Sequence, residues 1–339
     1  MPTKRVPLSF IAVLALACGR EQKAAPPRGS DAASAAPVAS ATASSPKPAA
    51  PKIFSPKRLT TLAVSAYRTS IAMDDEAVYL MTSNAAYRLI DGAPASGIEL
   101  DLGMGPTLTR SAFVFWSNGA IWSAPKAGGP TRELAKLAHQ PQYFVSSGDS
   151  FAWVDQTEDG VYTIQTLDRR APRVLLSSAG EIRALDMIGD AVYFVQRPED
   201  DAWRIGVVRL DGRAPEYVAT KKGRAPSQLA GSDGLYYFDL DTKRILKRSL
   251  DLAHEDVQLN ELVCSPLHVS TRIYCGCVEG LFDVSKDTLQ PRVLVYNRPG
   301  SITSIASNSK AVAWTVDIGT DQLAVDLLQA TESDGSPVP

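Results

Sequence analysis

The residues that most often build metal sites and acid–base sites are scarce in this chain. It has three histidines, His139, His254 and His268, and none lies at metal-ligand spacing from another. The sequence has no Gly-x-Ser-x-Gly nucleophile motif, no phosphate-binding glycine loop and no EF-hand-type calcium loop. We therefore expect a protein that is not an enzyme and that carries neither a metal nor another cofactor.

An excess of charge of one sign is also missing. The formal net charge of the 339 residues is −2, which gives no general reason to expect a nucleic-acid partner or electrostatic binding to an anionic membrane. The composition, 45% hydrophobic and 21% charged, is that of a globular protein with a core.

Long hydrophobic runs are absent, and the most apolar segment is a short one at the N-terminus. No segment approaches the roughly 20 apolar residues of a transmembrane helix. Residues 1–17 combine the basic pair Lys4 and Arg5 with the apolar run Val6–Ala17, and Cys18 follows. This pattern is typical of an export signal, which is removed from the mature protein.

The stretch Leu14–Cys18 resembles the bacterial lipobox, although Ala15 stands where that motif prefers leucine. The resemblance implies cleavage before Cys18 and lipidation of its thiol, and two or three acyl chains anchor a protein stably. Gly19, rather than aspartate, follows the cysteine, which favours the outer membrane by the sorting rule of enteric bacteria. The membrane would then be contacted through the lipid only. The alternative is an ordinary secretory signal with an incidental cysteine.

Residues 18–56 are mostly Ala, Pro and Ser. Such a segment has too little apolar surface to offset the entropy of ordering, so we expect a disordered linker. A coil of this length spans on the order of 35 Å, enough to hold a domain off a bilayer.

The rest of the sequence repeats. A polar turn followed by an apolar triplet recurs, and the central residues of the triplets are 35 to 43 positions apart. The seven central residues are Tyr79, Val114, Ala152, Tyr193, Tyr236, Tyr274 and Ala313. This period fits a four-stranded propeller blade. We therefore predict an all-β, seven-bladed β-propeller; a pair of β-sandwiches or a solenoid is the alternative.

Closure of the ring requires a strand from elsewhere, because the seventh repeat runs out of chain after residue 328. Residues 58–63 resemble the missing fourth strand, and we predict that they pair into the last blade and leave no open edge. The domains expected are residues 1–17 (signal), 18–56 (linker), 57–330 (propeller) and 331–339 (disordered tail).

The repeat from Gly119 to Ala135, with its glycine pair Gly128 and Gly129, resembles the propeller repeats of uncharacterised bacterial lipoproteins, especially myxobacterial ones. The resemblance implies a propeller loosely similar to TolB-type and NHL-type propellers. It implies a fold and not a function.

Charged residues are expected to gather on the face of the propeller where the loops between second and third strands meet the loops between blades. The candidate binding residues on this face are Tyr67, Arg68, Gln140, Asp155, Glu199, Asp200, Asp201, Arg224, Asp239, Asp241 and Arg298. We expect them to bind a protein or an envelope polymer. One alternative is a polysaccharide hydrolase or lyase that uses two of the carboxylates as acid and base. The other is a purely structural spacer, which would have neither a concave site nor a specific partner.

Three cysteines remain besides Cys18: Cys264, Cys275 and Cys277. An exported protein meets an oxidising compartment, so a disulfide is expected. Cys275 and Cys277 lie on the same side of a regular strand, and either can pair with Cys264.

Overall fold

The computed structural model describes residues 56–64, 69–82, 85–91, 93, 95–99, 107–260, 265–277, 280–287, 291–296, 300–319 and 321–329. All of them belong to one unit, Ala50–Pro339. The predicted signal, Cys18, nearly all of the predicted linker and the predicted tail, residues 331–339, lie outside the described residues. The described part of the chain contains no helix with the length and apolarity that a membrane crossing requires.

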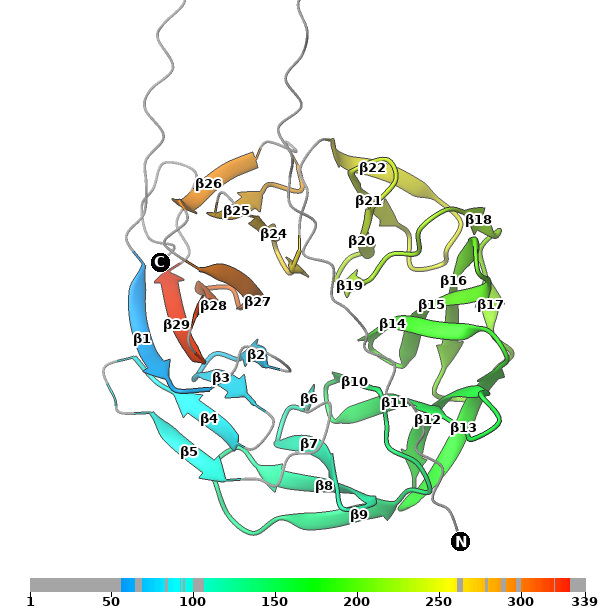
Figure 1. Ribbon diagram of the computed structural model, residues 1–339, viewed down its shortest axis with the longest axis horizontal. Coiled ribbons are helices and arrows are strands. Elements are labelled where there is room, and N and C mark those ends of the chain that lie inside the picture. The colour runs from blue at the N-terminus through cyan, green and yellow to red at the C-terminus, as the bar shows by residue number, and fades with distance from the viewer. Residues whose placement is uncertain are drawn as a thin grey trace, which may run out of the picture. The chain divides into compact units, whose positions relative to one another are not determined.

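Seven antiparallel sheets form a closed ring, which confirms the predicted propeller (Figure 1). Within each blade the strands are called A to D from the channel outward. Blades 1 to 3 are β2 (Ser70–Met73), β3 (Val78–Met81), β4 (Ala85–Leu89), β5 (Ser96–Glu99); β6 (Thr107–Leu108), β7 (Ala112–Ser117), β8 (Ala120–Pro125), β9 (Arg132–Lys136); and β10 (Tyr143–Ser147), β11 (Ser150–Gln156), β12 (Tyr162–Asp168), β13 (Ala171–Ser178).

Blade 4 carries one more strand than the others. Blades 4 to 6 are β14 (Glu181–Ile188), β15 (Ala191–Glu199), β16 (Ala202–Arg209), β17 (Glu216–Tyr217) with β18 (Lys221–Lys222) also on β16; β19 (Ala230–Gly231), β20 (Leu235–Asp239), β21 (Arg244–Arg248), β22 (Glu255–Asn260); and β23 (Leu267–Val269), β24 (Ile273–Cys277), β25 (Gly280–Val284), β26 (Pro291–Tyr296). β18 lies in the connection between blades 4 and 5, where Lys222 pairs with Ala202 and Lys221 with Trp203.

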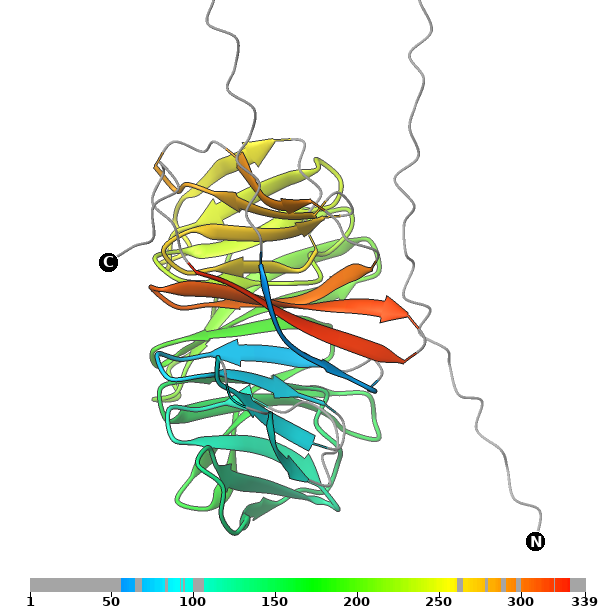
Figure 2. The same cartoon turned by 90° about the vertical axis from the view of Figure 1, so that its left-hand side faces the viewer.

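Blade 7 is closed by the N-terminal strand, as predicted. Its strands are β27 (Ser301–Ser307), β28 (Ala311–Gly319), β29 (Gln322–Gln329) and β1 (Lys57–Leu62), which lies alongside β29 in both views (Figure 2). Arg58 makes a paired contact with the buried Asp326, from Nε to Oδ1 at 2.7 Å and from Nη2 to Oδ2 at 3.0 Å. The ring therefore closes through backbone pairing and one partly buried ion pair.

The turns define two faces. The AB face carries the turns between strands A and B and between C and D; the BC face carries the turns between B and C and the connections between blades. In blade 7, β29 is strand C, so it starts at its turn with β28 on the BC face and ends at the AB face. β1 runs antiparallel to β29, with Lys57 opposite Leu327 and Leu62 opposite Leu323. β1 therefore begins at the AB face. The BC face is on the opposite side of the ring.

Apolar side chains fill the spaces between blades. The rings of Tyr79 in blade 1 and Phe113 in blade 2 meet edge to face at 5.6 Å, and Trp203 in blade 4 meets Tyr237 in blade 5 at 5.9 Å in the same way. Every repeat centre predicted from the sequence lies in a B strand and is at most 3% exposed. Burial on both faces of these strands explains why the apolar triplets are the most regular part of the repeat.

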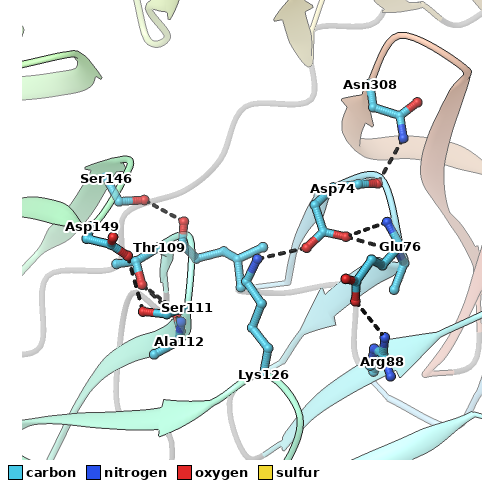
Figure 3. Close-up of polar contacts among 12 residues, drawn as sticks. Asp74, Glu76, Arg88, Thr109, Ser111, Ala112, Lys126, Ser146, Asp149 and Asn308 are labelled. Carbon is cyan, nitrogen blue, oxygen red and sulfur yellow. Dashed lines mark hydrogen bonds and ion pairs between the residues drawn. The ribbon is translucent and has the colours of Figure 1, made fainter.

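Polar contacts also cross each blade interface. In order from blades 1–2 to blades 7–1 they include Asp74–Lys126, Leu108–Ser146, Ser147–Gly189, Asp186–Gly231, Gln228–Leu267, His268–Ser307 and Ser304–Ile71. Figure 3 shows Asp74 on the AB face, where its carboxylate receives Lys126 and its backbone carbonyl receives the amide of Asn308. Neighbouring blades are thus fixed by directional bonds as well as by apolar packing.

Candidate functional site

The segment that carries Lys221 to Arg224 folds against the β15–β16 hairpin on the BC face. Pairing of β18 with β16 starts this contact, and the Gly223 amide extends it by donating to the Asp201 carbonyl at 2.9 Å. Lys221 is held by Glu255, whose Oε1 is 2.6 Å from Nζ, and it lies 5.5 Å from the Trp203 ring centroid. The short strand therefore joins blades 4 and 5.

Gly223 is required for this local path. Its φ is +106°, and a Cβ atom at this position would lie 2.1 Å from Oδ2 of Asp241. A side chain would therefore be strained and would displace that carboxylate. With glycine here, Arg224 donates to Asp241 through its backbone amide at 2.8 Å and through Nε at 2.9 Å, and these bonds lower the pKa of Asp241.

A cavity of about 410 Å³ opens between blades 4 and 5 beside this segment. Its charged lining residues are Arg183, Arg197, Asp200, Asp201, Arg224 and Asp241. The structure thus brings together four of the residues chosen from the sequence, namely Asp200, Asp201, Arg224 and Asp241. It adds two arginines that the sequence reasoning missed.

An ion-pair network fixes the side of the cavity nearest the channel. Oε2 of Glu181 lies 3.0 Å from Nε of Arg183 and 3.1 Å from Nη1 of Arg197, and Nη2 of Arg197 donates to the carbonyl of Asp200. Within the described residues, the carboxylates of Asp200 and Asp201 and the Nη1 and Nη2 groups of Arg183 have no partner. The cavity therefore offers two carboxylates and one guanidinium to a ligand.

Arg183 and Arg197 left a weak signal in the sequence. Glu181 and Arg183 alternate with the buried Ile182 and Ala184, which is the pattern of a strand with one charged face. That pattern does not reveal that Arg197, on the next strand, shares the same glutamate.

The structure corrects the predicted position of Asp155. The expectation that a loop presents it is wrong, because it lies in β11 and is 4% exposed. It continues the alternation of Phe151 and Trp153, which face blade 2, and burial raises the pKa of its carboxyl group. One of its oxygens accepts from Gln165 at 3.3 Å.

The other candidates on the BC face do not line the cavity. Gln140 is exposed in the connection after β9, and Glu199 ends β15. Asp239 caps its own turn by accepting from the amides of Asp241 at 2.9 Å and Thr242 at 3.1 Å. Asp239 thus has a structural role that is common for aspartate in turns.

Several predicted residues lie outside the described part of the chain: Tyr67, Arg68, Arg298, Cys18 and Cys264. Cys275 and Cys277 both lie in β24 and pack in the same cluster, Cys275 completely buried and Cys277 partly so. Cys275 is disulfide-bonded. That its partner is Cys264 stays a prediction, because Cys264 lies outside the described residues. Among the described residues, no group of three His, Cys, Asp or Glu side chains is placed to hold a metal ion.

Comparison with known proteins yields structures and no sequence family. No family model and no curated protein matches the chain. A puromycin-hydrolyzing peptidase from Mycobacterium tuberculosis is 15% identical with a TM-score of 0.55, over 80% of this chain and 55% of that one. The computationally designed protein Ika8 is 11% identical with a TM-score of 0.50, over 80% and 99%.

A third similar structure is a putative TolB from Agrobacterium tumefaciens, 19% identical over 56% of this chain and 78% of that one, with a TM-score of 0.43. The peptidase and the designed protein, with TM-scores of 0.55 and 0.50, support the fold alone at identities this low. Because an enzyme stands among these structures, the propeller fold does not by itself separate catalysis from binding.

Proposed function

We propose that this chain is an exported lipoprotein whose propeller is a non-catalytic recognition module, and that it binds a protein or an envelope polymer through its BC face. One observation carries the proposal. The cavity with unpartnered charges lies on the BC face, whereas β1 begins at the AB face. A tether that joins the propeller before Lys57 would therefore enter at the AB face, so its point of attachment would leave the BC face free for a partner.

The electrostatics of the cavity support binding. A glycosidase pair needs one carboxyl group with a raised pKa to donate a proton. Asp241 has the opposite property, because Arg224 lowers its pKa. A carboxylate that stays ionised beside an arginine, as Asp241 does, is suited to recognising charged groups.

The lipid anchor can be tested on the full chain. We expect Cys18→Ser to remove the acyl mass from the N-terminal peptide and to release the protein from the membrane fraction. Cys277→Ser is the control and should change neither result. A wild-type protein without acyl mass would overturn the anchor while leaving the recognition role open.

Recognition can be tested by affinity capture from envelope membranes after chemical crosslinking. We expect a reproducible partner that is lost when Glu199, Asp200 and Asp201 are all changed to alanine. Asp211→Ala combined with Arg213→Ala alters an exposed ion pair on the AB face and serves as the control. If the triple alanine variant of the β15–β16 hairpin still captured the partner while the control variant did not, the proposal would be contradicted.

A further inference from the structure

We propose that the partner is a polypeptide, and that one of its carboxylates binds Nη1 and Nη2 of Arg183 while a neighbouring basic side chain binds Asp200 and Asp201. This inference rests on the proposed recognition function and deepens it. It assigns the central contact to a residue on strand β14, at the wall of the channel.

Arg183 is held in place for such a contact. Its side chain is 42% exposed, and Glu181 fixes it through Nε alone. The two Nη groups of a guanidinium form a planar fork that matches a carboxylate with two parallel hydrogen bonds. A fork that is already oriented loses less side-chain entropy when it binds.

An exposed aromatic side chain lies next to this fork. Tyr143 belongs to β10, the inner strand of the adjacent blade, and β10 packs against β14. Its side chain is one of three large apolar ones exposed in the described residues, and the charges of Glu181 and Arg183 both act on its hydroxyl. Tyrosine and arginine are both enriched among the residues from which protein interfaces gain most of their affinity.

The charge balance argues against an anionic polymer. Four carboxylates, Glu181, Asp200, Asp201 and Asp241, stand against the three guanidiniums of Arg183, Arg197 and Arg224. A polyanion would meet the unpartnered Asp200 and Asp201 and be repelled. A polypeptide can present both signs of charge a few residues apart, which matches Arg183 on one side and the two aspartates on the other.

The test uses a phage library of random 12-residue peptides, selected on the full-length protein in lipid nanodiscs. Selected peptides are then synthesised and titrated by fluorescence anisotropy. We expect them to combine an acidic and a basic residue and to bind less tightly as salt increases.

Variants locate the contact. Arg183→Ala is expected to weaken binding about tenfold, because a charge-assisted fork is lost. Arg183→Lys should restore only part of the affinity, since a lysine keeps the charge without the fork. Asp200→Asn combined with Asp201→Asn should also weaken binding. Arg213→Ala is the matched control, because Arg213 pairs with Asp211 two residues before it, as Arg183 pairs with Glu181, but on the AB face.

Failure of this inference is distinguishable from failure of the proposed function. Unchanged melting temperatures show that the variants are folded. No selected peptide, or peptides whose affinity is the same for Arg183→Ala and wild type, would overturn the polypeptide and its contact. If envelope capture still depends on the hairpin, the recognition role stands; a captured polysaccharide would identify the other class of partner and overturn this inference.

Discussion

The ammonium of Lys126 lies 2.8 Å from the carboxylate of Asp74, and the two residues come from different blades. Asp74 belongs to the A–B turn of blade 1, and Lys126 follows β8 in the C–D turn of blade 2. Lys286 and Asp233 repeat the relationship between blades 6 and 5 at 2.5 Å. Each lysine also lies over the tyrosine at the repeat centre, at 5.1 Å from Tyr79 and 5.3 Å from Tyr236.

Loss of Lys126 should weaken the interface between blades 1 and 2. Burial alone would raise the pKa of Asp74, but Lys126 and the amides of Glu76 and Ala77 lower it to about 2. We expect Lys126→Met to reduce the free energy of unfolding by about 1 kcal/mol at pH 7.

The pH dependence of this effect has a definite sign. Because the pKa of Asp74 is lowered on folding, the stabilisation is complete above its ordinary value of 3.8 and disappears as the pH falls toward 2. Urea unfolding of wild type and Lys126→Met at pH 7 and pH 3 measures how the loss in the free energy of unfolding depends on pH. Lys310→Met, an exposed turn lysine, is the control; an equal loss in both variants would contradict the interface role.

Arg58 should contribute more than Lys57 to the free energy of unfolding through the contact that closes the ring. Arg58→Ala leaves the carboxylate of Asp326, which is 3% exposed, without its ion-pair partner. We expect a loss of about 2–3 kcal/mol in the free energy of unfolding. Lys57→Ala removes an exposed pair with Asp91 and should change stability by no more than about 0.5 kcal/mol. Thermal unfolding of both variants decides this, and equal losses would show that Asp326 does not need Arg58.

The repeat made most of the fold predictable from the sequence. Apolar triplets around Tyr79, Tyr193 and Tyr236 are buried on both sides, so their alternation and period carried the assignment of the B strands. The closing strand was predictable because a ring cannot tolerate an open edge. Lys221 and Lys222 show the limit: two lysines carry no strand signal, and their pairing depends on the Gly223 turn and on Glu255 in the next blade.

The candidate site was only partly predictable, for a similar reason. Asp200, Asp201 and Asp241 lie in hairpin turns and were found by their position in the repeat. The packing between repeats decides which two blades border the cavity and which side chains line it. The pattern within one repeat does not show this. Asp155 was misplaced although its phase with Trp153 was visible in the sequence, because a buried aspartate is rare.

His268 should make stability depend on pH. It accepts the Ser307 amide at 3.2 Å on Nε2, and burial lowers its pKa from 6.5 to about 4. Between pH 6.5 and about 4, His268 is therefore protonated in the unfolded chain but neutral in the folded chain. The free energy of unfolding falls as the pH drops below 6.5. We expect a loss of about 2 kcal/mol between pH 7.5 and pH 5 from this residue.

The variant His268→Gln isolates this contribution. Glutamine does not titrate, so its free energy of unfolding should change less than that of wild type over the same pH range. Urea titrations at both pH values measure the difference. Equal pH slopes for the two proteins would contradict the assignment.

The disulfide prediction can be settled by peptide mapping without reduction. Of the two cysteines predicted to pair with Cys264, we expect Cys275 rather than Cys277 to form the bond, because Cys275 is the disulfide-bonded one. Cys275→Ser and Cys277→Ser, mapped separately, show which one pairs. Alkylation of all three cysteines in the unreduced, unfolded protein would exclude the bond.

Site-specific photocrosslinking in intact cells tests most directly whether the BC face is the recognition face. A photoreactive amino acid replaces Asp200 on the BC face in one strain and Arg213 on the AB face in another, in the otherwise unchanged lipidated chain. The account predicts a discrete higher-mass adduct from position 200 and none from position 213. An adduct from position 213 alone would place recognition on the tethered side and contradict it.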